Sequence, residues 1–475
     1  MTRVGQNRSS HKDKTDMPHQ SSQELSSSLP DPVISQLLGK LFASLNNAGI
    51  RYAVLRNHEG LPARPGRDID FLTADFRQFK KILLQSAAEE GFRVLTFRRY
   101  SGMTKFHLVR FQADAIRIVE IDLAWSCRWK GIPLAPHDLL ERQRVWRQEI
   151  YILRSGAEAA ISLTKNLLYQ GIVLEKYRPE LPGMARNDQD GFVETLELCF
   201  GNQLTRRLCE LTCRGDWDRI EAMTGELRQA AIRNTIANQP LVQLGRWLVY
   251  HWWNIWKFFR NNGLFVVLIG PDGSGKSTTA AGLRQYLQPL FQGTRYFHFW
   301  FNVVPRLRDL AQFLGLKVPA TSSEKESVAA NAQENAVKLS TSKSSFYLLY
   351  YALDFFLGHF IIWRARGFGQ LIIFDRYFYD YLIQQTMSPP GWLTEVVLWL
   401  LPHPDAVVYL KNDPAVIYAR KPELSHAALE RQSAACSRLI SRSPHGYVVE
   451  TTGTPEETTR QVGRLLVEQM LQKAH

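Results

Sequence analysis

Runs of hydrophobic residues in the second half of the chain alternate with polar turns and with segments of helical spacing. A short unbroken apolar run is typical of a parallel strand that is buried on both faces. Runs of this kind predict five strands, at 264–269, 294–300, 371–375, 404–410 and 447–450. We therefore expect residues 261–475 to form an α/β domain, a five-stranded parallel sheet flanked by helices.

The first half of the chain has a different pattern. Residues 34–45 show helical spacing, whereas 68–72 and 116–123 alternate polar and apolar positions, as half-buried strands do. We expect a mixed domain of helices and strands over 33–150. Residues 151–260 show helical spacing throughout, which predicts a helical domain that ends in a connecting aromatic helix.

Two stretches lack the apolar residues that a packed core requires. Residues 1–32 are rich in Ser, Gln, Lys and His, and residues 319–345 are rich in Ser, Ala, Asn, Lys and Glu. The first is predicted to be a disordered tail, which has no apolar signal-peptide core, and the second a mobile insertion.

Charge and cysteine content narrow the choice of ligands and compartment. The chain of 475 residues carries a formal net charge of +13, which fits polyanionic ligands such as nucleotides, nucleic acid or a phospholipid surface. Its five cysteines are sparse and show no zinc-type pairing. With no secretion signal in view, they predict buried, reduced thiols and a cytoplasmic location.

The stretch Gly-Pro-Asp-Gly-Ser-Gly-Lys-Ser-Thr at 270–278 lies between a predicted strand and a predicted helix. A phosphate-binding loop requires this context, because glycines let backbone N–H groups turn toward a phosphate chain and the helix N-terminus adds positive charge. Lys276 would reach the β- and γ-phosphates of a nucleotide, and the Ser277 hydroxyl would bind Mg²⁺. The predicted nucleotide-binding residues are Gly270, Asp272, Gly273, Ser274, Gly275, Lys276, Ser277 and Thr278.

A second charged motif, Asp375-Arg376, ends the predicted strand 371–375. Ligands of a doubly wound sheet bind beyond the carboxyl ends of its strands, so this pair is expected beside the phosphate loop. Asp375 would hold the water shell of the metal, and Arg376 would bind an acceptor phosphate through two parallel hydrogen bonds. The alternative is an ordinary ion pair at a strand end.

Together, the loop, Asp-Arg-Tyr at 375–377, the basic stretch that begins at Arg420 and the Asp-Pro helix start resemble the thymidylate kinase family of P-loop kinases. The resemblance covers about residues 263–473. It implies that ATP, with Mg²⁺, donates its γ-phosphoryl group to an acceptor that is often a nucleoside monophosphate. It also implies that Asp272 binds a sugar hydroxyl and that Arg420 or Lys421 closes over the transferring group. The catalytic residues would then be Lys276, Asp375, Arg376 and Arg420.

The sequence departs from that family where the acceptor would bind. The Arg-Glu-Pro stretch of the family is replaced by residues 298–302, and Asp380 stands where the family has a serine, although Gln385 matches a base-contacting glutamine. A negative Asp380 is unfavourable beside an acceptor phosphate but could bind a hydroxyl. We therefore expect an acceptor other than thymidine monophosphate: a sugar, a sugar nucleotide or a modified nucleotide. Fused proteins of this kind are associated with bacterial surface-polysaccharide pathways, which the resemblance alone implies.

Carboxylates also gather in the first half of the chain. Strand alternation places Asp68 and Asp70 about 7 Å apart on one face, and Asp122 on a later strand could supply a third carboxylate for divalent metal ions. This part, over about 33–145, resembles the polymerase β-like nucleotidyltransferase superfamily, which implies an α+β fold and a metal site at these residues. That superfamily has a pair of small residues before the carboxylates, whereas this chain has Leu-Arg-Asn at 55–57. An active transferase, a degenerate binding domain and coincidence stay open.

Two apolar segments raise the question of a membrane. Residues 240–260 mix tryptophans with arginine and lysine, so they could lie in a membrane interface or dock the two halves together. We favour docking, with the aromatic side chains shielded by both halves, and keep peripheral membrane contact as the alternative. Residues 346–363 approach the length of a membrane span, but the phosphate loop and Asp375 must meet on one side, and Asp354 would be costly in lipid. We expect a buried helix and no transmembrane span.

Three classes of function are therefore compatible with the sequence. The favoured one is a small-molecule kinase whose partners are ATP and a phosphorylatable acceptor. The others are a bifunctional or mainly nucleotidyl-transferring enzyme and a nucleotide-gated binding or scaffold protein. A homodimer is compatible with each, and nucleic acid is not expected as a partner.

Overall fold

The computed structural model describes residues 31–473, except 67, 101, 113–114, 239, 260–261, 302, 306–340, 385–388 and 423. The predicted tail, most of the predicted insertion and Gln385 lie outside the described residues. The predicted tail ends too late in the sequence, and the predicted insertion also ends too late. Asp31 caps helix α1 (Pro32–Asn47) by accepting bonds from two backbone N–H groups, and the helix α14 (Thr341–Gly367) already includes residues 341–345.

The N-terminal lobe is built on a mixed sheet of seven strands in the order β3-β4-β5-β2-β1-β9-β8. Neighbouring residues along its strands face opposite sides: Tyr52 and Phe71 pack against helices α1 and α2 (Phe76–Glu89), whereas Ala53 and Leu72 belong to a second core. The strands are β1 (Tyr52–Val54), β2 (Asp68–Thr73), β3 (Arg93–Tyr100), β4 (Met103–Phe111), β5 (Ile116–Ala124), β8 (Arg144–Arg147) and β9 (Ile150–Leu153).

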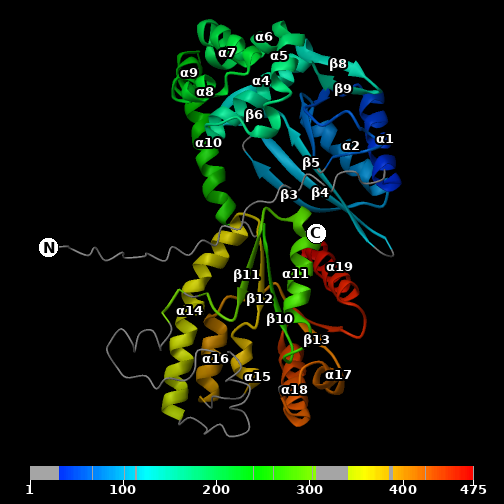
Figure 1. Ribbon diagram of the computed structural model, residues 1–475, viewed down its shortest axis with the longest axis vertical. Helices are drawn as coiled ribbons and strands as arrows, with labels where there is room; N and C mark the ends of the chain where they lie inside the picture. The colour runs from blue at the N-terminus through cyan, green and yellow to red at the C-terminus, as the bar shows by residue number, and fades with distance from the viewer. Residues whose placement is uncertain are drawn as a thin grey trace, which may run out of the picture.

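The helical region packs on the second face of this sheet, together with the hairpin β6 (Ser126–Trp129) and β7 (Ile132–Pro136). Sheet and helices therefore share one hydrophobic core (Figure 1). The helices are α3 (Leu139–Gln143), α4 (Ser155–Lys165), the π-helical turn η2 (Asn166–Gln170), η3 (Glu175–Tyr177), α5 (Leu181–Asn187), α6 (Gln189–Phe200), α7 (Asn202–Arg214), α8 (Trp217–Ala222), α9 (Thr224–Asn238) and α10 (Pro240–Phe259).

The C-terminal lobe confirms the predicted five-stranded parallel sheet, with the order β11-β12-β10-β13-β14. Helices cover both faces, and each face has its own buried core. The strands are β10 (Leu264–Ile269), β11 (Thr294–His298), β12 (Leu371–Asp375), β13 (Ala406–Lys411) and β14 (Gly446–Glu450). Besides α14, the helices are α11 (Lys276–Tyr286), η4 (Gln288–Leu290), α15 (Tyr379–Gln384), α16 (Gly391–Leu400), α17 (Pro414–Arg420), α18 (His426–Arg442) and α19 (Pro455–Lys473).

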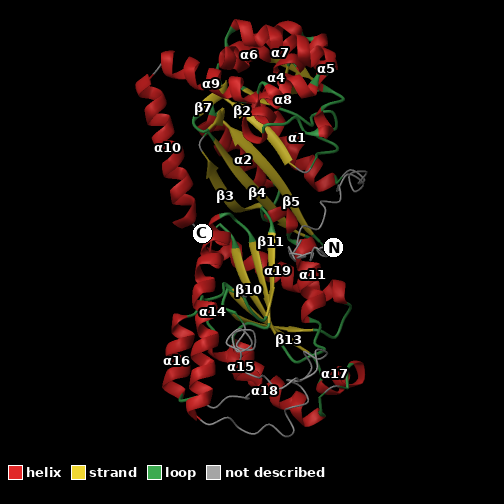
Figure 2. Ribbon diagram, turned by 60° about the vertical axis from the view of Figure 1, so that its left-hand side comes forward, coloured by secondary structure: helices red, strands yellow, loops and turns green. Residues whose placement is uncertain are grey.

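The two lobes meet where strands of the N-terminal sheet pack against α11 and α19. Buried Leu95 of β3 and Val109 of β4 belong to the same hydrophobic core as residues of these two helices. A hydrogen bond of 2.6 Å from Gln292 to the hydroxyl of Tyr100 also crosses the junction. Figures 1 and 2 show the N-terminal sheet standing over the C-terminal sheet at this junction.

The two apolar helices differ from the expectation. The aromatic side chains of α10 were expected to be shielded by both halves. Phe258 does pack against Trp363 and Phe368 of the C-terminal lobe, but Trp247, Trp252 and Phe259 are exposed, so that expectation is right only in part. Among the described helices, α14 alone is long and apolar enough to cross a membrane, and 33% of that stretch is buried. The predicted buried helix is therefore right for one face of α14, which packs on the sheet, and wrong for the other, which is exposed.

Candidate functional site

The predicted phosphate loop connects the buried strand β10 to the N-terminus of α11. Gly273 and Gly275 have φ angles of 87° and 89°, which residues with a side chain rarely adopt. A Cβ atom at Gly273 would also lie 3.3 Å from Ile417 Cγ2 of α17. The glycines therefore allow a tight turn whose backbone N–H groups lie next to a helix N-terminus, as phosphate binding requires.

Lys276 is buried inside this loop. Its Nζ donates hydrogen bonds of 2.8 Å to the carbonyl oxygens of Gly270 and Pro271 and lies 3.7 Å from Asp272 Oδ1. Burial lowers the pKa of Lys276 below its ordinary value, while Asp375 and Asp380 oppose this shift. A buried ammonium group beside two carbonyl oxygens is suited to an anion bound in the loop.

Asp375 meets the loop from the end of β12. Its Oδ2 accepts a hydrogen bond of 2.6 Å from Ser277 and one of 3.0 Å from the hydroxyl of Tyr296, and His298 Nδ1 lies 3.6 Å away. The side chain is 1% exposed, and its Oδ1 has no hydrogen-bond partner among the described residues. A carboxylate oxygen without a partner beside a hydroxyl fits an Mg²⁺ ion with its water shell. The residues predicted to converge, about a hundred positions apart, do lie together.

Tyr296 and His298 were not predicted as site residues. They lie two positions apart on β11, and the register pairs His298 directly with Asp375. Burial, together with the neighbouring Asp375, raises the pKa of Tyr296 to about 12, so its hydroxyl remains a donor to the carboxylate. The only signal in the sequence was the alternation along 294–298, which does not reveal the partner strand.

Arg376 has a φ angle of 63°, in the left-handed region that a non-glycine residue rarely adopts. Its guanidinium forms an ion pair with Asp272 of the loop, and its Nη1 lies 3.6 Å from Asp380 Oδ2 of α15. Strain of this kind persists only where the surroundings enforce it and often marks a functional site. Arg376 is thus held between two carboxylates at the edge of the phosphate loop.

The remaining predicted site residues differ in how deeply they are buried and in how close they lie to the phosphate loop. Ser274 is buried, whereas Ser277 and Thr278 are exposed in the first turns of α11. Arg420 ends α17 with its side chain exposed. The next residue, Lys421, lies beside the loop, since a Cβ on Gly273 would be 3.5 Å from Lys421 Cβ.

The predicted carboxylates of the N-terminal lobe do lie on neighbouring strands, because β2 and β5 pair Asp70 with Asp122 and Asp68 with Glu120. Basic side chains form ion pairs with these carboxylates, however. Arg56 pairs with Asp70 and, at 3.2 Å, with Asp68, and Lys105 lies 3.3 Å from Asp122. No group of three His, Cys, Asp or Glu side chains among the described residues is arranged to bind a metal. As arranged here, these residues do not fit a metal ion.

Burial also changes the charge of these carboxylates. It raises the pKa of Asp122 to about 7, with a contribution from the nearby Asp70. Burial acts the same way on Glu120, but hydrogen bonds from His107 and Lys105 outweigh it and lower the pKa of Glu120 to about 2. With its pKa at about 7, Asp122 is partly protonated at neutral pH, whereas Glu120 is ionised.

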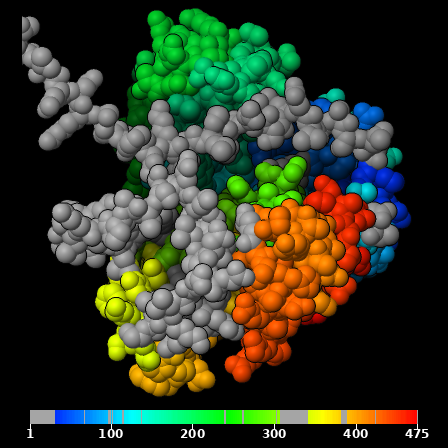
Figure 3. Space-filling model, turned by 60° about the horizontal axis from the view of Figure 1, so that its bottom comes forward, coloured from blue at the N-terminus to red at the C-terminus, as the bar shows by residue number. Residues whose placement is uncertain are grey.

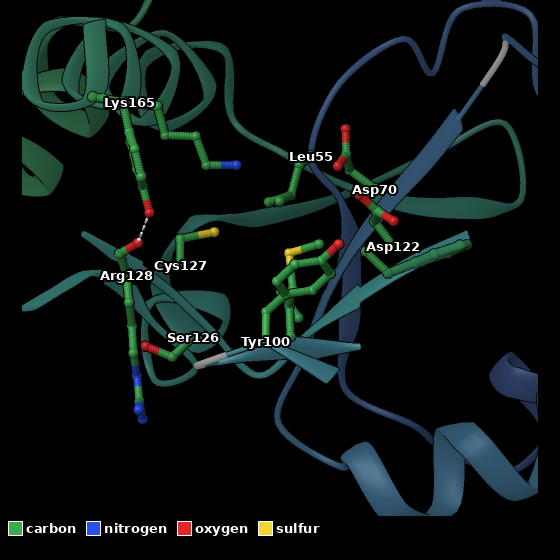
Figure 4. A pocket seen from close by; sticks show the side chains of 12 residues that line it. Leu55, Asp70, Tyr100, Asp122, Ser126, Cys127, Arg128 and Lys165 are labelled. Carbon is green, nitrogen blue, oxygen red and sulfur yellow. Dashed lines mark hydrogen bonds between the residues drawn. The ribbon is translucent and has the colours of Figure 1, made fainter. Parts of the chain in front are cut away.

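A cavity of about 190 Å³ opens beside Asp70 and Asp122. Figure 4 shows Lys165 reaching in from α4 toward the strands that carry Tyr100, Asp70 and Asp122, while the side chain of Arg128 points away. The cavity therefore combines cationic, aromatic and carboxylate side chains at the junction between the sheet and the helical region.

Comparison with known proteins gives matches to thymidylate kinases. A probable thymidylate kinase of Staphylothermus marinus is 26% identical over 167 residues, which is 35% of this chain and 71% of that protein. Among solved structures, the thymidylate kinase of Ehrlichia chaffeensis aligns with 16% identity and a TM-score of 0.28, over 43% of this chain and 98% of that one. The thymidylate kinase of Candida albicans aligns with 18% identity and a TM-score of 0.31, over 44% and 93%. A scan against models of protein families finds no match.

The similarity therefore covers part of the chain and supports a nucleotide kinase of the P-loop type, a phosphotransferase at the level of its family. These matches lend no support to the nucleotidyltransferase resemblance of the first half.

Proposed function

We propose that the C-terminal lobe is an ATP- and Mg²⁺-dependent kinase that phosphorylates a hydroxyl-rich small molecule, a sugar or a sugar nucleotide. The observation that carries this proposal is the meeting of Lys276, Ser277 and Asp375 at the carboxyl ends of β10 and β12. Loop, cation, hydroxyl and carboxylate are the parts with which P-loop enzymes bind a triphosphate and its metal.

On the donor side, the N–H groups of the loop and Lys276 would bind the β- and γ-phosphates. Ser277 and Asp375 would hold Mg²⁺, which supplies charge neutralisation on the phosphate oxygens when bound. Tyr296 donates to Asp375 and fixes its orientation. The acceptor oxygen then forms a bond to the γ-phosphorus, the bond to the β,γ-bridging oxygen breaks, ADP leaves with the electron pair, and the hydroxyl proton passes to water.

On the acceptor side, the surroundings of Arg376 favour a hydroxyl-rich molecule over thymidine monophosphate. The guanidinium already faces Asp272 and Asp380, so its charge is largely compensated before any acceptor binds. An acceptor phosphate placed there would face two carboxylates at close range, which is unfavourable in a partly buried site. Hydroxyl groups can donate to the same carboxylates without this repulsion.

The N-terminal lobe does not favour the alternative of nucleotidyl transfer. Its carboxylates are paired with Arg56 and Lys105, whereas a two-metal mechanism needs them free to bind cations. We propose that the kinase reaction is the activity of the chain.

The test uses the full-length protein, labelled ATP and a panel of sugars, sugar nucleotides and nucleoside monophosphates. We expect ADP and a phosphorylated sugar or sugar nucleotide, and Lys276→Ala should abolish both. Lys411→Ala, a change of the same kind at an exposed lysine paired with Glu450, should leave turnover unchanged. ADP formation that survives Lys276→Ala, or release of pyrophosphate in its place, would overturn the proposal, and phosphorylation of nucleoside monophosphates alone would overturn the acceptor class.

A further inference from the structure

The exposed apolar side chains of this protein gather on three helices, α10, α14 and α16. The exposed fractions are 83% for Leu241, 60% for Trp252, 65% for Phe259, 63% for Phe360, 68% for Trp392 and 75% for Trp399. Scattered apolar side chains are normal on a protein surface, but a contiguous group of large ones marks an interaction site. We call these three helix faces together the apolar edge.

The apolar edge is continuous across both lobes. The ring of Phe259 at the end of α10 lies 6.1 Å from the ring of Trp363 in α14, and α14 in turn packs beside α16. Figures 1 and 2 show α10 and α14 along the same side of the molecule, and in Figure 3 the yellow surface of α14 adjoins the gold surface of α16. From their lengths of 20 and 27 residues, α10 and α14 span about 30 Å and 40 Å.

The exposed positions form helical stripes that are separate from the folded core. In α14, residues 346, 349, 353, 356, 360 and 363 lie on the exposed side, at intervals of three or four. Leu348, Phe355 and Ile362 on the other side are buried in the core of the sheet. Folding of the C-terminal lobe therefore uses one face of this helix and leaves the second for another contact.

The charges on these helices favour an anionic surface as that contact. Their sequences contain five basic residues, Arg246, Lys257, Lys343, Arg364 and Arg366, and two acidic ones, Asp354 and Glu395. Arg366 is paired with Asp405 at 2.8 Å, which leaves four basic residues for this count. Asp354 is buried and accepts bonds from the backbone N–H groups of Phe301, Val303 and Val304, so Glu395 is the exposed acid. Tryptophan flanked by arginine and lysine is the composition of helices that lie in a membrane interface.

We propose that the apolar edge binds the surface of an anionic phospholipid membrane, with α10, α14 and α16 lying along it. The helices insert their tryptophan and phenylalanine rings into the headgroup region, and Lys343 and Arg364 contact the phosphates. Helix α14 does not cross the bilayer, because its other face and Asp354 are built into the C-terminal lobe. A second copy of the chain fits this face less well, because each copy carries a net charge of +13.

The test is sedimentation of the full-length protein with vesicles of phosphatidylglycerol and phosphatidylcholine, compared with phosphatidylcholine alone. We expect binding to the mixed vesicles that falls as salt is raised, since each basic residue near an anionic surface contributes about fivefold in affinity. The double variant Trp252→Ser/Trp399→Ser should bind at least about tenfold more weakly. Trp146→Ser is the matched control, because Trp146 is 54% exposed but lies on β8, away from the apolar edge.

Lys343→Glu/Arg364→Glu separates the charge contribution from the apolar one. It should weaken binding to the mixed vesicles about tenfold or more and reduce the dependence on salt. The kinase assay in solution, without vesicles, should give the same turnover for all these variants, so a failure here is independent of the proposed activity.

Three results would overturn the proposal. One is a wild-type protein that stays in the supernatant with the mixed vesicles. Another is an equal loss of binding in Trp146→Ser. The third is a dimer in analytical ultracentrifugation that Trp252→Ser/Trp399→Ser dissociates without any effect on lipid binding, since the face would then join two copies.

Discussion

Replacement of Asp375 by asparagine tests the centre of the proposed site. The carboxylate is almost completely buried and holds two hydroxyl groups through one oxygen, at 2.6 Å from Ser277 and 3.0 Å from Tyr296. Its other oxygen has no partner among the described residues. Asparagine keeps the shape of the side chain and removes its charge, so the substitution isolates the electrostatic part of its role.

The expected loss can be worked out from these contacts. A hydrogen bond to a charged group contributes about 1–1.5 kcal/mol more than one to a neutral group, so the two bonds together weaken by about 2–3 kcal/mol. If this weakening applies to the ATP–Mg²⁺ complex, kcat/KM falls by about 30- to 150-fold. The fold should not suffer, because asparagine also removes the cost of burying a charge.

The assay measures kcat/KM for ATP as a function of Mg²⁺ concentration, together with the melting temperature. Asp375→Asn should require at least about tenfold more Mg²⁺ for half-maximal rate. Asp405→Asn is the matched control, since Asp405 is a buried carboxylate at the opposite end of the same sheet, 2.8 Å from Arg366. That control should melt at a lower temperature and keep its Mg²⁺ dependence. An Asp375→Asn enzyme with the wild-type Mg²⁺ dependence would refute the reasoning.

Three further predictions concern single residues. Gly273→Ala should weaken ATP binding in calorimetric titration by about five- to thirtyfold because its φ is 87°, whereas Gly39→Ala, in a helix with no atom nearby, should have no effect. Arg376→Lys should raise KM for the acceptor about tenfold and leave KM for ATP unchanged, because a lysine ammonium cannot face Asp272 and Asp380 at once as the two ends of the guanidinium do. Since burial raises the pKa of Asp122 to about 7, its ionisation costs stability as the pH rises from about 4 to 7, so Asp122→Asn should raise the melting temperature at pH 8 and hardly at pH 4.

The strands of the C-terminal lobe could be predicted from the sequence, because buried parallel strands appear as short runs of apolar residues. The central strands β10, β12 and β13 are buried on both faces, so each had to be almost wholly hydrophobic, whereas the edge strands β11 and β14 are partly exposed and carry polar residues. Each predicted strand agrees with the structure to within two residues. The aromatic helices were not predictable in the same way. A helix rich in large aromatic residues has a similar sequence at a protein contact and at a lipid surface, and the sequence of α10 does not show which neighbours it has.

Within the site, sequence motifs identified residues that lie close together in the chain. They missed residues that reach the site only through the pairing of neighbouring strands. The loop and Asp375-Arg376 were found because their residue types are fixed by phosphate chemistry. Tyr296 and His298 were missed, because only the pairing of β11 with β12 places them beside Asp375. In the N-terminal lobe, alternation correctly placed Asp70 and Asp122 together, but the pairing of Asp70 with Arg56 depends on the path of a loop, which the sequence does not fix.

The junction between the lobes leads to a last prediction, that they unfold together. Leu95 and Val109 of the N-terminal sheet are 1% and 0% exposed, and they lie in the same core as the helix that begins at Lys276. Neither lobe can open there without exposing apolar surface of the other. ATP with Mg²⁺ at a hundred times its Kd stabilises the folded state by about 2.7 kcal/mol, and this should shift one transition in calorimetry that covers the whole chain. Leu95→Ala should cost about 2–5 kcal/mol and lower that same transition, with or without ATP. Two separate transitions, of which ATP moves only one, would show that the shared core does not couple the lobes.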